Sequence, residues 1–380
     1  MKHKVAIVIG TRPEAIKLWP LIEILREDPL IEPTVISTGQ HGSMISNMLR
    51  DLEIQPDVAL ANRIAPGSLS TLLSSLLVAI EEVLLENKPS IVVVQGDTAS
   101  ALAGTIAAFF ARIPVAHVEA GLRTHDLKAP FPEEFNRQAI ARVADLHFAP
   151  TNVAAANLIR EGISPERVIL TGNTVVDATI KMLQNIQSQK NKEKQSHLLE
   201  SFGLEPLSEG NFAIVTLHRR ENAGKHFETV LQGLRNTALK RKDFRFIFPV
   251  HPNPIISKIV NQHLGDLQNV VLTDPLVYRD FLFLLSRCKF VLTDSGGIQE
   301  EALTLGKRIL IAREDTERQE GVSHGLAELV DLTSSDLSQT IIREIEKASF
   351  SNSEKTTNPY GDGRSSQKIR DALVSFLTQH

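Results

Sequence analysis

Short apolar runs rich in β-branched residues alternate with amphipathic helical stretches along almost the whole chain. Runs such as 5–9, 91–95 and 115–118 contain five apolar residues or fewer before a polar residue or glycine. Such runs, separated by helices, are typical of strands in a parallel sheet that helices cover on both faces. The pattern therefore predicts an α/β fold.

The alternation stops near 184–211 and then restarts. Strands are expected at 5–9, 34–38, 91–95, 115–118, 146–149, 168–170, 212–216, 244–250, 270–272, 290–293 and 309–312. Helices are expected at 13–27, 99–112, 227–240 and 278–287. With 380 residues, the chain exceeds the ~250–300 at which a single core stops growing. We therefore predict two Rossmann-like, doubly wound domains in series, with 184–211 read as a solvated helical surface and then a loop.

The composition of the chain argues against several classes of function. Lys and Arg number 41 against 45 Asp and Glu, so the net charge of −4 argues against a nucleic-acid partner. No run approaches the ~18 apolar residues of a membrane span, and the apolar run near the N-terminus is too short for a signal peptide. A cytoplasmic protein without a membrane partner is expected. Cys288, the single cysteine, excludes a disulfide framework and a cysteine-built metal site.

Unusual polar residues follow the expected strands directly. They occur at Gly10-Thr11-Arg12, Gly39-Gln40-His41, Gly96-Asp97-Thr98, His117-Val118-Glu119, His218-Arg219-Arg220, His251 and Asp294-Ser295-Gly296-Gly297. Open α/β sheets bind ligands outside the carboxyl ends of their strands. Two such sheets would line a central cleft from both sides, so a site between the domains is expected.

The segment from Gly10 to Lys17 indicates an anion site. Thr11 and Glu14 fit a capping box at the start of a helix, which needs no further function. Arg12 and Lys17, however, are cations in the first turns, where each opposes the helix dipole by about 0.3–1 kcal/mol. A bound anion would reverse that effect. We favour this interpretation over surface charge.

The segment Asp294-Ser295-Gly296-Gly297 follows a strand and begins a helix. Adjacent glycines allow a phosphate to approach the backbone N–H groups closely. The alternative is a tight turn with Ser295 as N-cap. The segment is not a Walker motif, and no G-x-G-x-x-G follows any strand, which argues against a dinucleotide cofactor.

Several carboxylates are expected near one sheet edge. Asp97, Glu119 and Glu133 flank neighbouring strands, and carboxylates close together shift each other's pKa values as acid–base catalysis requires. A lone loop carboxylate is usually only solvated, and isolated histidines such as His218 and His251 are more often structural than catalytic. No His-Glu-x-x-His or similar spacing indicates a metal.

Taken together, the motifs resemble those of the bacterial non-hydrolysing UDP-N-acetylglucosamine 2-epimerases. The resemblance rests on motifs in order along the chain: Gly10–Lys17, Gly96–Thr98, His117–Thr124, Pro132–Glu134, His218–Glu221, Thr293–Glu301, Thr316–Arg318 and Asn358–Gly363. It covers essentially the whole length. Each motif is weak alone, but the ordered set is specific.

The resemblance implies a glycosyltransferase-B-like architecture. The N-terminal domain would comprise 1–171 plus 366–380, with a terminal helix at 369–377, and the C-terminal UDP-binding domain would comprise 172–365. The implied enzyme is a homodimer that interconverts UDP-N-acetylglucosamine and UDP-N-acetylmannosamine for cell-surface polysaccharide precursors, with no cofactor. The implied mechanism is elimination of UDP to 2-acetamidoglucal, followed by re-addition.

Site residues follow from the matching motifs. The implied acid–base set is Asp97, Glu119, Glu133 and His218, with Asp97 and Glu133 in proton transfer and His218 assisting the leaving group. Which residue is the base and which the acid stays open. The implied UDP-sugar-binding residues are Arg12, Lys17, Arg137, His251, Leu276, Phe281, Ser295, Gly296, Gly297, Glu301 and Arg318, with Leu276 and Phe281 near the uracil.

Other functions compete with this one. A hydrolysing relative would release N-acetylmannosamine, other relatives act on modified UDP-sugars, and a glycosyltransferase would need an acceptor. A sensor that binds without turnover would have no need for the acid–base set. Gly42-Ser43 departs from the family pattern where many relatives bind a second, activating UDP-N-acetylglucosamine.

Overall fold

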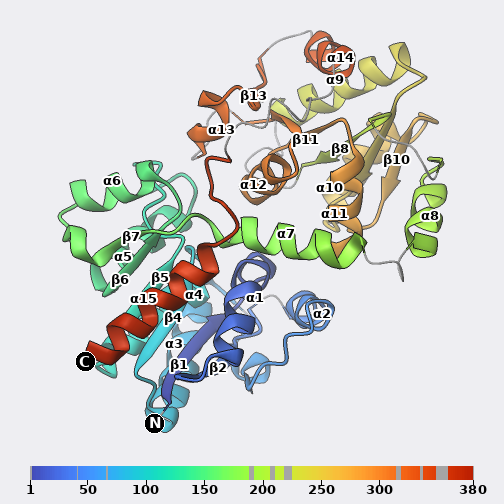
Figure 1. Ribbon diagram of the computed structural model, residues 1–380. Coiled ribbons are helices and arrows are strands. Elements are labelled where there is room, and N and C mark those ends of the chain that lie inside the picture. The colour runs from blue at the N-terminus through green and yellow to red at the C-terminus, as the bar shows by residue number, and fades with distance from the viewer. Residues whose placement is uncertain are drawn as a thin grey trace. The chain divides into compact units, whose positions relative to one another are not determined.

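The chain divides into two compact units in the computed structural model (Figure 1). The first comprises Met1–Ala178 and Tyr360–His380, and the second Thr179–Pro359. The structure describes residues 2–40, 42–65, 67–187, 192–205, 210–217, 225–313, 318–333, 337–347 and 358–379. The expected boundary after residue 171 precedes helix α7 (Thr174–Gln187), whereas the units divide within this helix.

The first unit is built on a seven-stranded sheet in which every pairing is parallel. Its strands are β1 (His3–Ile9), β2 (Ile31–Ser37), β3 (Val58–Ala59), β4 (Ile91–Gln95), β5 (Val115–Val118), β6 (Leu146–Ala149) and β7 (Val168–Leu170). The strand order is β3-β2-β1-β4-β5-β6-β7. The chain adds β2 and β3 on one side of β1 and β4 to β7 on the other side, so the winding of the chain reverses between β1 and β4. This switch point is where doubly wound sheets bind ligands.

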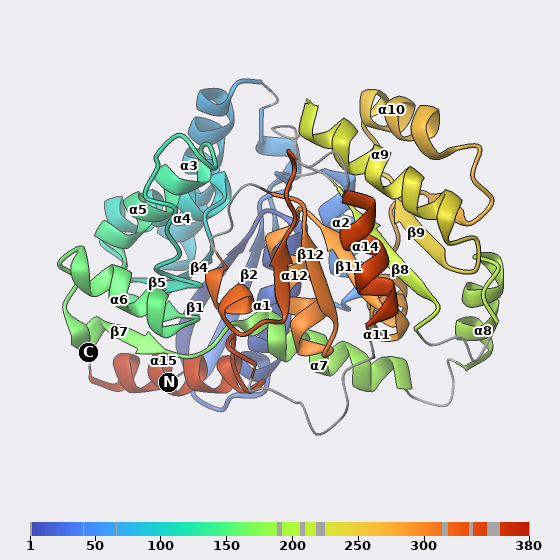
Figure 2. The ribbon, with the colours of Figure 1, turned by 90° about the horizontal axis from the view of Figure 1, so that it is seen from above.

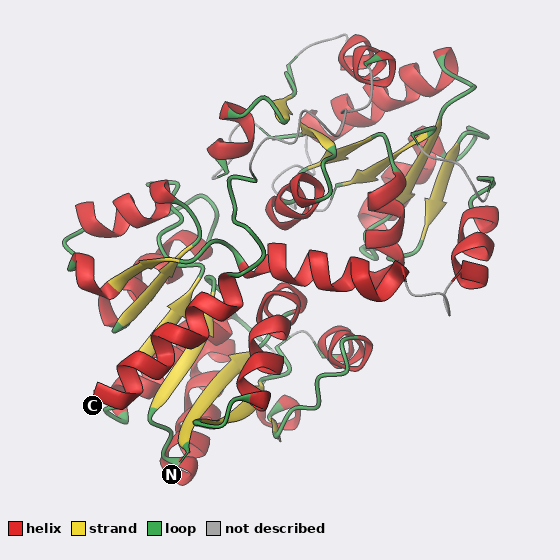
Figure 3. Ribbon diagram, viewed as in Figure 1, coloured by secondary structure: helices red, strands yellow, loops and turns green. Residues whose placement is uncertain are grey.

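Helices connect these strands (Figure 3). They are α1 (Arg12–Glu27), α2 (Ser43–Asp51), α3 (Leu69–Asn87), α4 (Ala99–Phe110), α5 (Glu133–Val143), α6 (Asn152–Arg160), the start of α7 and α15 (Ser365–Gln379), with short 3-10 turns η1 (Ala61–Arg63) and η2 (Pro165–Arg167). Apolar side chains of α3 and α4 pack on β1, β2 and β4 in one core cluster. The C-terminal helix α15 packs against α1 (Figure 2), and Arg370 of α15 forms an ion pair with Asp28.

The second unit repeats the plan with a six-stranded parallel sheet. Its strands are β8 (Phe212–Thr216), β9 (Arg245–Pro249), β10 (Val270–Thr273), β11 (Phe290–Thr293), β12 (Arg308–Ile311) and β13 (Ala327–Leu329). Its helices are α8 (Lys192–Ser201), α9 (Lys225–Lys240), α10 (Pro254–Leu264), α11 (Tyr278–Arg287), α12 (Gly296–Thr304), α13 (Gln319–Ser323) and α14 (Leu337–Glu346).

The strand order β10-β9-β8-β11-β12-β13 gives the second unit its own switch point, between β8 and β11. Side chains of α9, α10 and α14 pack on one face of this sheet. The predicted α/β class with two Rossmann-like units is thus confirmed. Within the described ranges, no helix has both the length and the apolar character needed to cross a membrane.

Candidate active site

Glu14 joins the two turns at the first switch point. It lies in the first turn of α1, fully buried, and its Oε2 accepts hydrogen bonds from the backbone N–H groups of Gly10 and Thr11 at 2.9 and 2.6 Å. Its Oε1 accepts a hydrogen bond from the Thr98 hydroxyl at 2.7 Å. Burial raises the pKa of Glu14 to about 7. The predicted capping residue therefore also ties the turn after β1 to the turn after β4.

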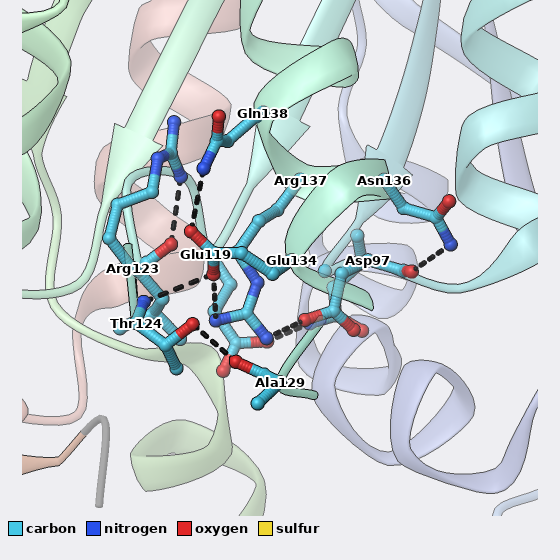
Figure 4. Close-up of polar contacts among 12 residues, drawn as sticks. Asp97, Glu119, Arg123, Thr124, Ala129, Glu134, Asn136, Arg137 and Gln138 are labelled. Carbon is cyan, nitrogen blue, oxygen red and sulfur yellow. Dashed lines mark hydrogen bonds and ion pairs between the residues drawn. The ribbon is translucent and has the colours of Figure 1, made fainter. Parts of the chain in front are cut away.

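Asp97 lies next to Thr98 in the turn after β4. Its carboxylate forms an ion pair with the Arg137 guanidinium of α5, and its carbonyl accepts a 2.8 Å hydrogen bond from the Asn136 side chain. Figure 4 shows Arg137 between Asp97 and Glu134, whose carboxylate is 3.4 Å from Arg137 Nη1. The Asp97 side chain keeps 27% of its surface exposed, so it can contact a ligand.

Glu119, directly after β5, is the most heavily hydrogen-bonded of the expected carboxylates. Its two oxygens lie 2.6 and 2.7 Å from the Lys17 ammonium. The side-chain amides of Gln95 and Asn173 donate to it as well. Its backbone has φ +63°, a strained conformation for a non-glycine residue. Lys17 is therefore a buried ion-pair partner of Glu119, and spacing along the chain did not predict this contact.

The adjacent residues Glu133 and Glu134 have different environments. Glu133 begins α5 and is half-buried. Glu134 is fully buried, and its carboxylate accepts hydrogen bonds from the backbone N–H groups of Thr124 and His125 at 3.0 and 3.3 Å. Glu134 thus fixes the loop that precedes α5, and Glu133 is the more accessible of the two carboxylates.

The switch point of the second unit carries the predicted glycine pair. Thr293, the last residue of β11, accepts hydrogen bonds from the Thr216 hydroxyl at 2.7 Å and from Ser295 N–H at 3.0 Å. Gly296 and Gly297 then begin α12. A Cβ at Gly297 would have no atom within 4 Å, so the space beside this residue is open.

Arg318 packs over the start of α12 because position 296 is glycine. A Cβ built on Gly296 would lie 2.6 Å from the Arg318 Cζ. The Arg318 Nε donates to Glu300 at 2.8 Å, and both side chains are almost fully buried. The neighbouring Glu301 is also buried. Burial and the Glu301 charge raise the pKa of Tyr278 well above its usual value.

The other expected site residues have partly accessible positions or lie outside the described ranges. Arg12, Leu276, Phe281 and His251 are all half-buried, and His251 Nδ1 accepts a hydrogen bond from Asn253 N–H at 3.2 Å. His218 lies outside the described residues. Cys288 is buried.

The side chains of Gln95, Asn173 and Thr98 also contact carboxylates of the first unit, although no motif of the sequence indicated these contacts. The available signal was weak: Gln95 is a polar residue ending an apolar strand, and Asn173 follows Gly172 after β7. No group of three or more His, Cys, Asp or Glu that could hold a metal ion occurs in the described part of the chain. The first unit thus gathers carboxylates paired with cations, and the second places two adjacent glycines at the start of α12.

Comparisons with known proteins agree on one family. The family model described as UDP-N-acetylglucosamine 2-epimerase matches residues 23–374. The chain is 42% identical over 381 residues to the UDP-N-acetylglucosamine 2-epimerase of Campylobacter jejuni, covering 98% of each chain.

Two solved structures have similar folds. One, of a UDP-GlcNAc 2-epimerase from Neisseria meningitidis bound to UDP-GlcNAc, has a TM-score of 0.90 at 36% identity, covering 98% of this chain and all of the other. The other, of the Methanocaldococcus jannaschii UDP-GlcNAc 2-epimerase in complex with UDP-GlcNAc and UDP, has a TM-score of 0.84 at 34% identity, covering 98% and 99%.

Proposed function

The chain belongs to the UDP-N-acetylglucosamine 2-epimerase family, and from this we propose that it interconverts UDP-N-acetylglucosamine and UDP-N-acetylmannosamine without releasing free sugar. The observation that carries the proposal is the pair of ion-paired carboxylates after β4 and β5, Asp97 with Arg137 and Glu119 with Lys17. They provide fixed charges after two neighbouring strands of the first sheet, and the Asp97 side chain is partly accessible there.

The chemistry needs such a site because the C2 proton of the sugar is not next to a ring carbonyl. We propose that a base removes the C2 proton while the C1–O bond to UDP breaks, so that UDP leaves with the bonding electrons and a C1=C2 double bond forms. The product is 2-acetamidoglucal. A proton then adds to C2 from the opposite side, and a β-phosphate oxygen of UDP attacks C1 to restore the glycosidic bond.

The proposed roles in the first unit follow accessibility. Asp97 and Glu133, both half-buried, are proposed to carry protons to and from C2. Glu119 is proposed to act as a member of the same set, with its charge held by Lys17. His218 is proposed to assist the departing diphosphate. Preorganised charges of this kind stabilise the charge that develops in a transition state.

The second unit is proposed to bind the UDP group. Gly297, which has open space beside it, and the half-buried Ser295 at the start of α12 are proposed to contact phosphate oxygens, with Gly296 between them. The half-buried side chains of Leu276 and Phe281 would contact the uracil. The other proposed UDP-sugar-binding residues are Glu301, Arg318, Arg12, Lys17, Arg137 and His251. We also propose that the enzyme is a cytoplasmic homodimer without a cofactor. Light scattering would test the dimer, and the activity of the dialysed protein would test the independence from a cofactor.

The decisive experiment is incubation with UDP-N-acetylglucosamine in deuterated water, without acceptor or nicotinamide, followed by NMR. The proposal expects deuterium at C2 of both epimers, with UDP still attached. Free N-acetylmannosamine would identify a hydrolysing enzyme instead. Epimerisation without deuterium uptake would contradict the elimination mechanism, and no reaction would contradict the activity.

A further inference from the structure

Asn173 forms hydrogen bonds through its backbone and through both groups of its side-chain amide. It is buried between β7 and α7. Its Nδ2 donates to Glu119 Oε1 at 3.1 Å, and its Oδ1 accepts from Val175 N–H at 3.2 Å. Its backbone N–H donates to the Tyr360 carbonyl at 2.7 Å. One residue thus joins a candidate catalytic carboxylate to a distant segment of the chain.

That segment is where the chain returns to the first unit. The first unit runs to Ala178 and resumes at Tyr360, so Asn173 lies just before the exit and Tyr360 at the re-entry. The neighbouring Gly172 has φ +86°, and a Cβ there would lie 2.7 Å from Ser365 Oγ and 3.1 Å from the Tyr360 carbonyl oxygen. The exit and re-entry segments are therefore in close contact beside Asn173.

The orientation of the Glu119 carboxylate depends on its donors. Its backbone conformation is unfavourable for a non-glycine residue, so surrounding contacts must hold it in place. Lys17 and Gln95 come from α1 and β4, within the sheet region, whereas Asn173 comes from the exit segment. Small displacements of a reacting group are costly to catalysis.

We propose that Asn173 is a positioning residue that orients the Glu119 carboxylate and makes this orientation depend on the exit and re-entry segments of the first unit. The inference rests on the proposed function, because it assumes that Glu119 takes part in the reaction. It adds a connection between the reaction site and the two points at which the chain crosses between units.

Asn173→Asp tests the contact with Glu119. The substitution preserves shape and the acceptor for Val175 N–H, but it replaces the donor to Glu119 by a second carboxylate. We expect kcat to fall by about 10²-fold with KM little changed. The acidic limb of the pH–rate profile should move to higher pH, because a nearby like charge raises a carboxylate pKa.

The matched control is Asn157→Asp in α6. Asn157 is another buried asparagine of the first unit, and its Nδ2 donates to the Gly121 carbonyl at 3.0 Å. We expect it to lose stability without the shift in the pH–rate profile. If Asn173→Asp does not fold, Asn173→Ser, whose side chain is too short to reach Glu119, replaces it with the same expected loss of kcat. Wild-type kcat and pH profile in the Asn173 variants would overturn the inference.

A pair of glycine substitutions tests the dependence on the re-entry segment. Gly172 and Gly162 have nearly the same backbone conformation, φ +86° and +88°, but a Cβ at Gly162 would have no atom within 4 Å. Alanine at either position carries the left-handed penalty, so both should lower Tm, and Gly172→Ala should lower it further because of its close contacts with Ser365 and Tyr360. Only Gly172→Ala should displace residues 360–365 and lower kcat. Equal kcat in the two variants would overturn this part of the inference.

Failure of the proposed function and failure of the positioning role of Asn173 give different results. If the wild-type enzyme converts no UDP-N-acetylglucosamine, the proposed function itself is wrong. If the wild type is active and Asn173→Asp behaves as Asn157→Asp does, only the positioning role of Asn173 is wrong.

Discussion

At the carboxyl ends of β4 and β5 the first unit gathers carboxylates and cations, whereas at the carboxyl end of β11 the second unit presents a serine and two glycines. Both sheets have the same strand order around their first strand. The carboxylate of Glu119 is surrounded by donors, while the backbone at Gly297 is open. The same strand order therefore carries paired charges in one unit and a glycine pair at a helix start in the other, which matches the proposed division into acid–base chemistry and anion binding.

The comparison teaches that the chemistry lies in the residues after the strands rather than in the fold. In the first unit the carboxylates are held by side chains from other elements, as Arg137 of α5 holds Asp97. In the second unit the feature on which the proposed UDP binding depends is the absence of a side chain at Gly296 and Gly297. Each unit can thus be disabled separately by substitution.

The largest expected effect is that of Asp97→Asn in the first unit. The substitution keeps the shape but removes the charge that pairs with Arg137 and the capacity to carry a proton. We expect turnover to fall by about 10²–10⁴-fold, the usual contribution of an acid–base group, with UDP affinity retained. Epimerisation followed by NMR and UDP binding followed by calorimetry would measure both quantities.

Asp126→Asn is the control, because Asp126 is an exposed aspartate of the loop before α5. It should retain wild-type turnover. An Asp97→Asn enzyme with full activity would remove Asp97 from the mechanism, and one that loses UDP binding would remove the separation of roles between the units.

Breaking the buried ion pairs should have the next largest effect, on stability. Lys17→Met removes the ammonium from the buried Glu119, and Arg318→Met removes the guanidinium from the buried Glu300. Each should lower the free energy of unfolding by about 3–5 kcal/mol. Hydrogen exchange measured by mass spectrometry should place the first loss in the first unit and the second loss in the second unit.

Replacing both partners provides the check. Lys17→Met with Glu119→Gln leaves no charge at the buried pair, so much of the lost stability should return. An exposed pair such as Arg63 with Glu82 should matter by less than about 1 kcal/mol when Arg63 is replaced. Additive losses at Lys17 and Glu119 would show that the pair is not the source of the effect.

Much of the fold could be predicted from sequence because the strands are continuous apolar runs. The runs 91–95 and 115–118 coincide with β4 and β5. The strands β3 (Val58–Ala59) and β13 (Ala327–Leu329) were not predicted, because β3 has only two residues and Glu328 interrupts the apolar residues of β13. The equally short edge strand β7 (Val168–Leu170) is wholly apolar and was predicted.

The site was predictable in position but not in its pairings. Sequence placed Asp97 and Glu119 at one edge, since the carboxyl ends of parallel strands meet there. It did not show that Lys17 would contact Glu119, 102 residues away, or that Asn173 would join them. Such contacts depend on side-chain reach in three dimensions, which the spacing of residues along the chain does not encode.

Acid should destabilise the first unit through two buried histidines. His117 and His147 are partners on β5 and β6, and burial lowers the pKa of His117 to about 3 and of His147 to about 4. An unfolded histidine titrates near 6.5, so below that pH the unfolded chain binds more protons and stability falls. Each histidine should lower the free energy of unfolding by about 2 kcal/mol when the pH has fallen to 4.5.

Glu14 opposes this effect. Its folded pKa of about 7 lies above the value of 4.5 for an unperturbed carboxyl, so its contribution to stability is present below pH 4.5 and lost as pH rises through 7. The net loss between pH 7 and 4.5 should be about 2 kcal/mol. Over this pH range the Glu14→Gln variant should lose more free energy of unfolding than the wild type, and the His147→Asn variant should lose less. Denaturant unfolding at several pH values would measure both, and identical pH dependence in all three proteins would contradict the assignment.

The smallest effect, but the sharpest test of the second unit, concerns its two glycines. A Cβ at Gly296 would collide with the Arg318 guanidinium that pairs with Glu300, so Gly296→Ala should lower the stability of the second unit. A Cβ at Gly297 has open space, and alanine is favoured over glycine in a helix, so Gly297→Ala should raise stability by about 0.5 kcal/mol. The same methyl group would obstruct a phosphate approaching the backbone. Gly297→Ala should therefore be more stable and yet bind UDP more weakly in calorimetry, and unchanged UDP affinity would mean that the phosphates bind elsewhere.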